Sequence, residues 1–204
     1  MTDKELMLKN KPYIAESSEL QAERAKAKKA IRKFNEIPYD MANERENLLK
    51  NFFGKTGEHV YIEPPFYCDY GYNVEVGENF YANYDLIILD CAKVKIGKNA
   101  FIGPRVGIYA AGHPIDADVR NFYLEYGKNI TIGDNVWIGG NTVINPGVTI
   151  GDNVVIGSGA VVTKDIPSNV IAAGVPCKVI REITEEDKIY WEKEKENYIK
   201  NKNF

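Results

Sequence analysis

The chain has little of three features that would identify a functional class directly: a net charge of one sign, long apolar runs, and histidine and cysteine. A net charge of −3 over 204 residues, without a basic stripe, gives no reason to expect nucleic-acid binding. No apolar run approaches the roughly 20 residues that span a bilayer, and the polar start MTDKELMLKN does not resemble a signal peptide. We therefore expect neither a nucleic acid nor a membrane as a partner.

Cysteine is scarce as well. The three cysteines, Cys68, Cys91 and Cys177, are odd in number and lack the CxxC spacing of metal and redox motifs. We expect them to be reduced, small core residues in a cytoplasmic protein. Because none has a histidine near it in the sequence, a catalytic thiol is not favoured.

A six-residue period from Ile132 onward is the strongest pattern that the chain does contain. This period fits neither a helix nor an alternating strand. It is typical of a solenoid in which each hexad forms one short strand and one corner, with an aliphatic side chain inside. Glycine or asparagine near the corner would supply a positive φ. The first position of successive hexads is always aliphatic: Ile132, Ile138, Ile144, Ile150, Ile156 and Val162.

The period also runs upstream, from Val76 to Ile108, with one shift of two residues. Ile108 and Ile132 are 24 residues apart, still a multiple of six, but residues 113–129 lose the aliphatic pattern. We predict a loop that protrudes from one corner without shifting the phase of the solenoid. Loops of this length in compact domains are usually functional or disordered, and three aromatic residues in this one argue against disorder.

These patterns divide the chain into three parts. Residues 1–58 predict charged helices, one of them with Ser18 and Gln21 as a capping box. Residues 59–182 form the solenoid, and residues 183–204 a final helix. We expect the helices to cap the solenoid, because its open ends would leave strand edges free to associate.

Only two histidines compete for the role of a general base. His59 lies in a polar segment before the solenoid and is predicted to be a surface residue. His113, in AAGHPID, lies at the mouth of the protruding loop, between small residues that let another molecule approach. Imidazole, with an unperturbed pKa of about 6.5, is suited to accept a proton near neutral pH. A histidine that only completes a turn is the alternative.

Four motifs occur in a characteristic order: CDYGYNVEVGENFYAN, GHPID, the stretch from IGDNVW to TKDIP, and AAGVPCKVIREI. With them the chain resembles the maltose/galactoside O-acetyltransferases, which are hexapeptide-repeat acyltransferases, over nearly its whole length. CDYGYN, HPID and WIGG are closer to the maltose branch. The resemblance implies a mainly β fold, a left-handed parallel β-helix with N-terminal helices that cover the acceptor cleft and a C-terminal helix. It also implies a homotrimer with active sites between neighbouring subunits. Left-handed crossovers are an exception to the usual rule.

The resemblance further implies transfer of acetyl from acetyl-CoA to the hydroxyl of a sugar such as maltose, glucose or a galactoside, without a metal. A hydroxyl is too weak an acid to ionise at pH 7, so a base must remove its proton as the oxygen attacks the thioester. Such catalysis contributes about 10²–10⁴ in rate. By the resemblance His113 is this base and transfer is direct. A backbone N–H at a solenoid corner would stabilise the oxyanion.

Acceptor-binding residues also follow from the resemblance. Asn83, in NFYAN, matches the family motif directly, whereas Asp69 rests on the maltose-like CDYGYN. Carboxylates and amides suit sugar hydroxyls, although such residues also cap turns. Glu125 replaces a methionine of the galactoside branch, and Cys91 and Ala15 replace aspartates, which leaves the identity of the acceptor open. The candidate set is Asp69, Asn83, Asp90 and Glu125.

Acetyl-CoA is expected along an outer groove near the C-terminal coils. Trp137 would pack against the pantetheine arm, with a buried or subunit-contact tryptophan as the alternative. Lys178 and Arg181 follow the last coil, where they would form charge-assisted bonds to phosphates or remain solvated. The candidate set is Trp137, Gly140, Ser158, Thr163, Lys164, Lys178 and Arg181.

Other functions of a hexapeptide solenoid fit less well. A zinc-dependent carbonic anhydrase needs three histidine ligands, and this chain has two histidines, one of them outside the solenoid. A hexapeptide acetyltransferase for another hydroxyl or an amine is the nearest alternative. A non-catalytic trimeric scaffold that binds sugar stays open too, because a fold alone does not determine a function.

Overall fold

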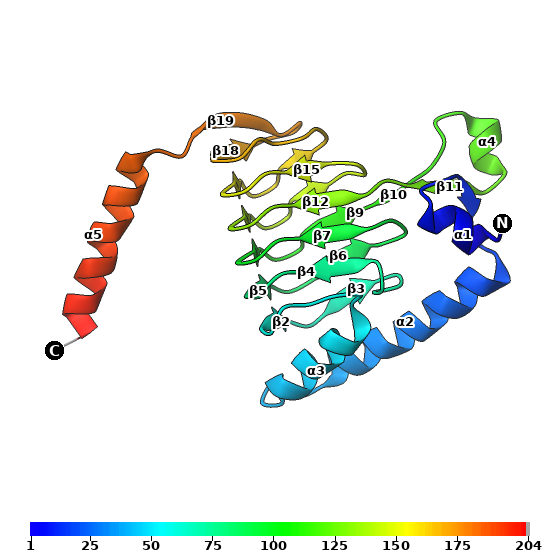
Figure 1. Ribbon diagram of the computed structural model, residues 1–204, viewed down its shortest axis with the longest axis horizontal. Coiled ribbons are helices and arrows are strands. Elements are labelled where there is room, and N and C mark those ends of the chain that lie inside the picture. The colour runs from blue at the N-terminus through cyan, green and yellow to red at the C-terminus, as the bar shows by residue number, and fades with distance from the viewer. Residues whose placement is uncertain (203–204) are drawn as a thin grey trace.

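The computed structural model describes residues 1–202 and has a triangular β-helix at its centre (Figure 1). Three sheets with parallel pairing between coils form its faces, and successive coils pair in register, as Ile132 with Ile150 and Ile138 with Ile156. The mainly β class and the solenoid predicted from the six-residue period are confirmed. Its left-handedness stays a prediction.

The chain visits the three faces in a fixed order in each coil. The first face holds β4 (Val74–Val76), β7 (Val94–Ile96), β12 (Ile130–Ile132) and β15 (Thr149–Ile150). The second face holds β2 (Val60–Ile62), β5 (Phe80–Ala82), β8 (Phe101–Ile102), β13 (Trp137–Ile138), β16 (Val155–Ile156) and β18 (Val170–Ala173), and ends in the antiparallel β19 (Lys178–Glu182). The third face holds β3 (Phe66–Cys68), β6 (Leu86–Leu89), β9 (Gly107–Tyr109), β14 (Val143–Ile144) and β17 (Val161–Val162).

The repeated residues serve two different purposes. The aliphatic first positions are buried, with Ile138 and Ile144 at 0% exposure, so they form the core as predicted. Asparagines supply the positive φ at the corner between the first and second faces, as at Asn135 (57°) and Asn153 (53°). The glycine in the second position instead allows coils to approach, because a Cβ on Gly139 would lie 2.5 Å from the backbone nitrogen of Ser158.

The N-terminal helices cover the first coil. After α1 (Asp3–Leu8) and β1 (Tyr13–Ile14), α2 (Ser18–Glu36) and α3 (Ala42–Phe52) lie across the end of the solenoid (Figure 1). Phe34 of α2 packs edge-on against Phe66 of β3, with ring centroids 6.1 Å apart. The predicted capping box at Ser18 is wrong, because the N-cap is Ser17, its side chain makes no capping hydrogen bond, and the Gln21 amide donates to the Glu16 carbonyl instead.

Residues 113–129 protrude as predicted, but they contain regular structure. This segment includes α4 (Ala117–Asn121) and β11 (Leu124–Gly127), which pairs with β10 (Ala111–Gly112) on one side and with β1 on the other. We call the three-stranded sheet β1–β11–β10, together with α4, the arm. The phase of the solenoid is kept on both sides, because Ile108 pairs with Ile144 and Ile132 with Ile96.

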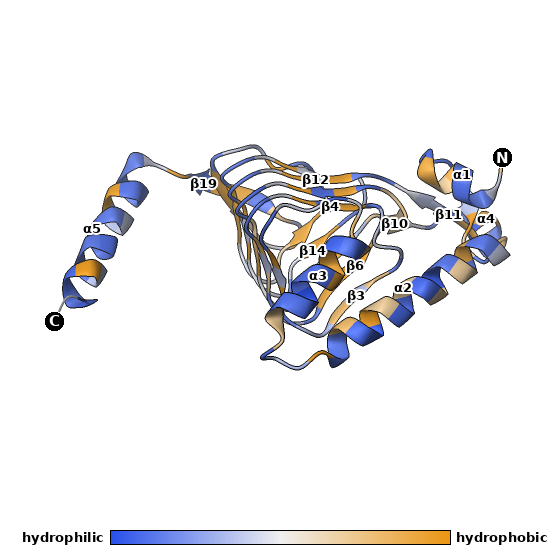
Figure 2. Ribbon diagram, turned by 60° about the horizontal axis from the view of Figure 1, so that its bottom comes forward, coloured by the Kyte–Doolittle hydropathy of each residue, from blue (hydrophilic) through white to orange (hydrophobic). Residues whose placement is uncertain are grey.

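The C-terminal helix does not cap the solenoid. Helix α5 (Glu185–Lys202) projects away from the coils (Figures 1 and 2), and none of its residues, all within the described part of the chain, is buried. Its first turn is fixed at the root, where Arg181 forms two hydrogen bonds of 2.6 and 2.7 Å to Asp187. Across residues 1–202, none of the helices has the length and apolar character that crossing a membrane requires.

Candidate active site

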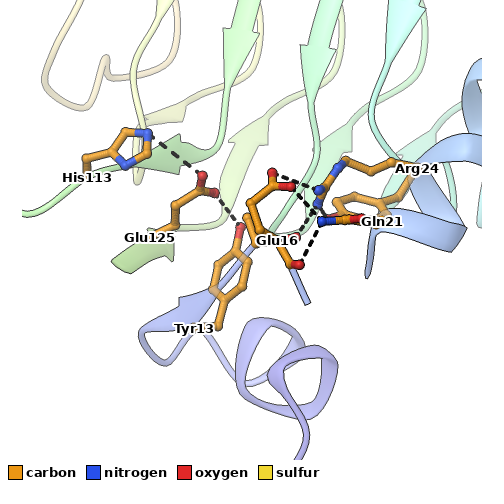
Figure 3. Close-up of polar contacts among 8 residues, drawn as sticks. Tyr13, Glu16, Gln21, Arg24, His113 and Glu125 are labelled. Carbon is orange, nitrogen blue, oxygen red and sulfur yellow. Dashed lines mark hydrogen bonds and ion pairs between the residues drawn. The ribbon is translucent and has the colours of Figure 1, made fainter. Parts of the chain in front are cut away.

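His113 lies at the base of the arm, directly after β10. Its side chain is 55% exposed, and Nε2 lies 3.9 Å from Oε1 of Glu125 (Figure 3). Both residues line a cavity of about 390 Å³, together with Ala15, Glu16, Arg120 and Tyr123. The imidazole that the sequence singles out therefore opens onto a space that a second molecule can enter.

Glu125 lies between His113 and a residue that no motif indicated. The hydroxyl of Tyr13 donates to Oε2 of Glu125 at 3.0 Å, and Tyr13 is itself 1% exposed (Figure 3). Burial holds the pKa of Tyr13 well above its ordinary value, with Cys91 and Glu125 adding to the effect. Tyr13 therefore stays a phenol and acts toward Glu125 as a donor.

A second cavity of about 190 Å³ adjoins the first. The two share Ala15, Glu16 and Glu125, and the second also reaches Asp69 and Cys91. The Arg24 guanidinium closes one side by donating to the Ala15 carbonyl and the Tyr70 hydroxyl at 2.8 and 2.9 Å. His113 and Asp69, which lie 44 positions apart in the sequence, thus line neighbouring cavities that share three residues.

Asp69 is half-buried beside another carboxylate. Burial, and then the charge of Asp90, raise its pKa to about 6, although Arg24 and Lys28 oppose the shift. Near neutral pH it is mostly ionised and accepts hydrogen bonds from hydroxyl groups. Asp69 also borders a third cavity of about 460 Å³ between α2 and the third face, lined among others by Lys28, Ile31, Tyr67 and Leu89.

Asp90 has a different place from the direct acceptor contact that the sequence suggested. It is 0% exposed, and its carboxylate accepts from the backbone N–H groups of Tyr70 and Gly71, both at 2.8 Å, and from the Cys68 thiol at 3.2 Å. Because both oxygens are satisfied inside the protein, Asp90 holds the turn at residues 69–71. The turn then places Asp69 at the second cavity.

Cys91 lines the second cavity as a neutral group. It is 2% exposed, and burial raises the pKa of its thiol to about 12. All three cysteines are free and buried, as predicted. Cys91 adds no charge to the second cavity, which leaves Asp69, Glu16 and Glu125 as the carboxylates that line it.

Within the chain, the predicted residues lie in two groups, at opposite edges of the third face. Asn83 follows β5, and Gly140 and Ser158 follow β13 and β16, so these three lie at the corner between the second and third faces. His113 lies at the opposite corner, after β9 and β10, and Thr163 and Lys164 lie there too, after β17. The strands of the third face therefore separate the two groups.

The remaining cofactor candidates lie on the second face. Trp137 is 57% exposed and stands in one column with Phe101 and Val155 of neighbouring coils. Lys178 and Arg181 belong to β19 at the end of this face, where Arg181 is held by Asp187. Trp137 thus presents an apolar surface to solvent rather than filling the core.

His59 is a surface residue, as predicted, with a side chain 75% exposed. Residues 1–202 contain no group of three or more histidine, cysteine, aspartate or glutamate side chains placed to hold a metal ion. The sequence missed Tyr13, Arg24 and Lys28, which reach the site from the N-terminal segment. Tyr13 precedes the predicted helix start at Ser18, and Arg24 and Lys28 follow it. No motif or spacing in the sequence indicates that these three side chains would reach the site.

Comparisons with known proteins match both the helical cap and the solenoid. The maltose acetyltransferase hexapeptide capping motif matches residues 6–57, the hexapeptide repeat of succinyl-transferase residues 93–116, and the bacterial transferase hexapeptide (six repeats) residues 129–164. The galactoside O-acetyltransferase of Escherichia coli (strain K12) is 50% identical over 175 residues, 86% of this chain and 86% of that protein.

Two solved structures agree with these matches. A maltose O-acetyltransferase from Clostridium difficile 630 is 54% identical, with a TM-score of 0.89 over 90% of this chain and 98% of that chain. A galactoside acetyltransferase in complex with coenzyme A is 47% identical, with a TM-score of 0.89 over 92% of this chain and 94% of that chain.

Proposed function

The chain belongs to the maltose/galactoside O-acetyltransferase family of hexapeptide-repeat enzymes, and we propose that it transfers acetyl from acetyl-CoA to a sugar hydroxyl with His113 as the general base. The observation that carries the proposal is the exposed imidazole of His113 on a cavity that adjoins the one lined by Asp69. The acceptor is a glucose-, maltose- or galactoside-like sugar.

The chemistry follows from the groups present. His113 takes the proton of the acceptor hydroxyl while the oxygen forms a bond to the thioester carbonyl carbon. When the tetrahedral intermediate collapses, the carbon–sulfur bond breaks and the imidazolium returns the proton to the departing thiolate. No acyl-enzyme is needed, because one histidine serves both steps.

The acceptor sugar lies in the cavity beside Asp69, whose ionised carboxylate accepts hydrogen bonds from ring hydroxyls. The Oδ1 of Asn83 accepts a hydrogen bond from the backbone N–H of Tyr84 at 2.8 Å, so Asn83 contributes its amide NH₂ group as a donor to the same sugar. The uncharged Cys91 and Ala15 leave room in the second cavity, which both residues line.

The protein acts as a homotrimer with sites shared between copies. The division of the candidate residues supports this, because His113, Thr163 and Lys164 lie at one corner and Asn83, Gly140 and Ser158 at the other. When the first corner of one copy faces the second corner of its neighbour, the two groups form one groove. A site of this kind is incomplete in a single chain.

Acetyl-CoA lies along this groove, and the enzyme works in the cytoplasm, where its three free cysteines stay reduced. Trp137 packs against the pantetheine arm, and Gly140 and Ser158 let it approach the backbone. Lys164, Lys178 and Arg181 bind the phosphates through charge-assisted hydrogen bonds.

Mass spectrometry of a panel of mono- and disaccharides incubated with acetyl-CoA tests the activity. We expect a mass increase of one acetyl group on at least one glucose-, maltose- or galactoside-type sugar. Coenzyme A release without an acetylated sugar, or acetylation of amines alone, would contradict the proposal.

The shared site has a test of its own. His113→Ala and Asn83→Ala trimers should each have low activity, while trimers refolded from a mixture of the two should regain part of it. Mixed trimers contain sites that join an intact His113 from one copy with an intact Asn83 from another. If mixing restores nothing although the trimers form, the two residues belong to one copy.

A further inference from the structure

Glu125 connects two parts of the chain that lie far apart in the sequence. Its Oε1 faces Nε2 of His113 at 3.9 Å, and its Oε2 accepts a hydrogen bond of 3.0 Å from the hydroxyl of Tyr13 (Figure 3). Its side chain is 25% exposed, against 55% for His113. The carboxylate is therefore anchored on its inner side and directed toward the imidazole on its outer side.

The sheet of the arm fixes these three residues. Tyr13 of β1 stands directly opposite Glu125 of β11, and Gly112 of β10 stands opposite Tyr126, so His113 follows the strand on the other side of Glu125. Residues on neighbouring strands keep a fixed spacing through the backbone ladder. The N-terminal strand β1 thus sets the position of Glu125, and β10 sets that of His113.

We propose that Glu125 is a positioning residue for His113, held in place by the Tyr13 hydroxyl, so that β1 is part of the catalytic unit; this rests on the proposed function of His113 as the base. In this role Nε2–H of His113 donates a hydrogen bond to Oε1 of Glu125. The lone pair of Nδ1 then faces the acceptor hydroxyl. When Nδ1 takes the hydroxyl proton, the new imidazolium lies beside a carboxylate that is already in place.

The separation of 3.9 Å is longer than a hydrogen bond. Contacts between a catalytic base and its orienting group are often long without substrate and tighten when it binds, and a single water can bridge such a gap. The anchored Oε2 limits how far the carboxylate can turn away. The exposed imidazole therefore makes the closing movement.

The same geometry favours the positioning role of Glu125 over the direct contact with the acceptor sugar that the sequence suggested. Oε2 accepts a hydrogen bond from the Tyr13 hydroxyl, and this contact turns Oε1 toward His113 before a sugar arrives. A direct acceptor ligand would show its loss in the KM for the sugar. A positioning residue shows it in kcat.

Kinetics with acetyl-CoA and the sugar from the panel that is acetylated fastest test the proposal. Glu125→Gln keeps the shape and removes the charge, and we expect kcat to fall about 10–100-fold, a part of the general-base contribution, with little change in either KM. Tyr13→Phe should lower kcat about 3–10-fold. Because Tyr13 acts through Glu125, the double variant should be no slower than Glu125→Gln alone.

Two matched controls accompany these variants. Tyr126→Phe removes a hydroxyl from the next residue of β11, and Glu75→Gln removes a carboxylate that pairs with Lys93 on the solenoid. Both should keep wild-type kcat. A Glu125→Gln enzyme with unchanged kcat and a raised sugar KM would overturn the proposal while leaving the proposed function intact. A wild-type enzyme that acetylates no sugar would remove the proposed function instead.

A readout without turnover keeps the proposal testable in that case. The chain has only two histidines, so the imidazole ¹⁵N shifts of His113 can be assigned in a His59→Gln background. We expect neutral His113 to hold the Nε2–H tautomer, and Glu125→Gln to shift its ¹⁵N signals toward a mixture of tautomers, because an amide can present either an oxygen or an NH₂ group. Identical shifts in both proteins would overturn the positioning role.

Discussion

The solenoid and the arm are stabilised in different ways. In the solenoid each coil repeats the contacts of the one before, so Ile138 pairs above and below with Ile156 and Ile102 in the same environment. In the arm each contact occurs once and joins distant parts of the chain, as Tyr13 with Glu125. Repetition therefore supplies stability, whereas the single contacts of the arm can be shaped for chemistry.

The largest effect that would test this division is a loss of activity from the arm without a loss of stability. We expect His113→Ala to lower kcat by about 10²–10⁴, the contribution of general-base catalysis. Because its side chain is 55% exposed, the melting temperature and the affinity for coenzyme A should stay near wild type. Steady-state kinetics, calorimetric titration with coenzyme A and thermal unfolding measure the three quantities. Unchanged turnover would remove His113 from the mechanism.

A core substitution in the solenoid should have the opposite signature. Ile138 is 0% exposed, and Ile138→Ala removes buried methyl groups between two coils. We expect the free energy of unfolding to fall by about 2–5 kcal/mol, because the rigid stack cannot close the cavity fully. Denaturant unfolding measures this, with the exposed Ile115→Ala in the arm as the control. A loss below about 1 kcal/mol would mean that neighbouring coils adjust freely.

Much of the fold and part of the site could be predicted from the sequence, and the division is the same as that between solenoid and arm. A six-residue period determines a repeated environment, so burial of the hexad residues and the phase across residues 113–129 followed from spacing. The contact of Tyr13 with Glu125 comes from pairing between β1 and β11, whose sequence separation carries no period. Arg24 reaches Ala15 and Tyr70 from α2, which the period does not describe either. The place of Asp90 was missed for another reason: its partners lie one coil upstream, but the six-residue period describes the inward aliphatic positions and not the polar turns between strands.

Asp69, on the solenoid side of the site, gives a prediction about pH. Its folded-state pKa of about 6 lies above the ordinary value of about 3.9, so the folded protein binds this proton more tightly than the unfolded chain. The ionised carboxylate therefore costs stability, and the cost grows as pH rises from about 4 to about 6 and is level above.

Asp69→Asn should remove that cost. We expect equal stability of the two proteins near pH 4 and an advantage of up to about 3 kcal/mol for Asp69→Asn near pH 7. Denaturant unfolding at several pH values measures the difference, with Asp118→Asn in the exposed α4 as the control. A constant difference across this range would show that Asp69 titrates normally and that its surroundings are more hydrated than its burial implies.

The smallest expected effect comes from the cofactor side, where single charges act near solvent. Lys164→Ala and Arg181→Ala should each raise the KM for acetyl-CoA by about 3–10-fold, since an exposed cation adds only a modest charge-assisted bond. Arg181 also holds Asp187 at the root of α5, so Asp187→Asn separates the two roles. If Arg181 contacts acetyl-CoA directly and does not act through the position of α5, Asp187→Asn should leave the KM for acetyl-CoA unchanged while Arg181→Ala raises it. If the sugar KM alone moves in Lys164→Ala and Arg181→Ala, the groove near the last coils binds the acceptor, and the assignment of the two ends of the site must be reversed.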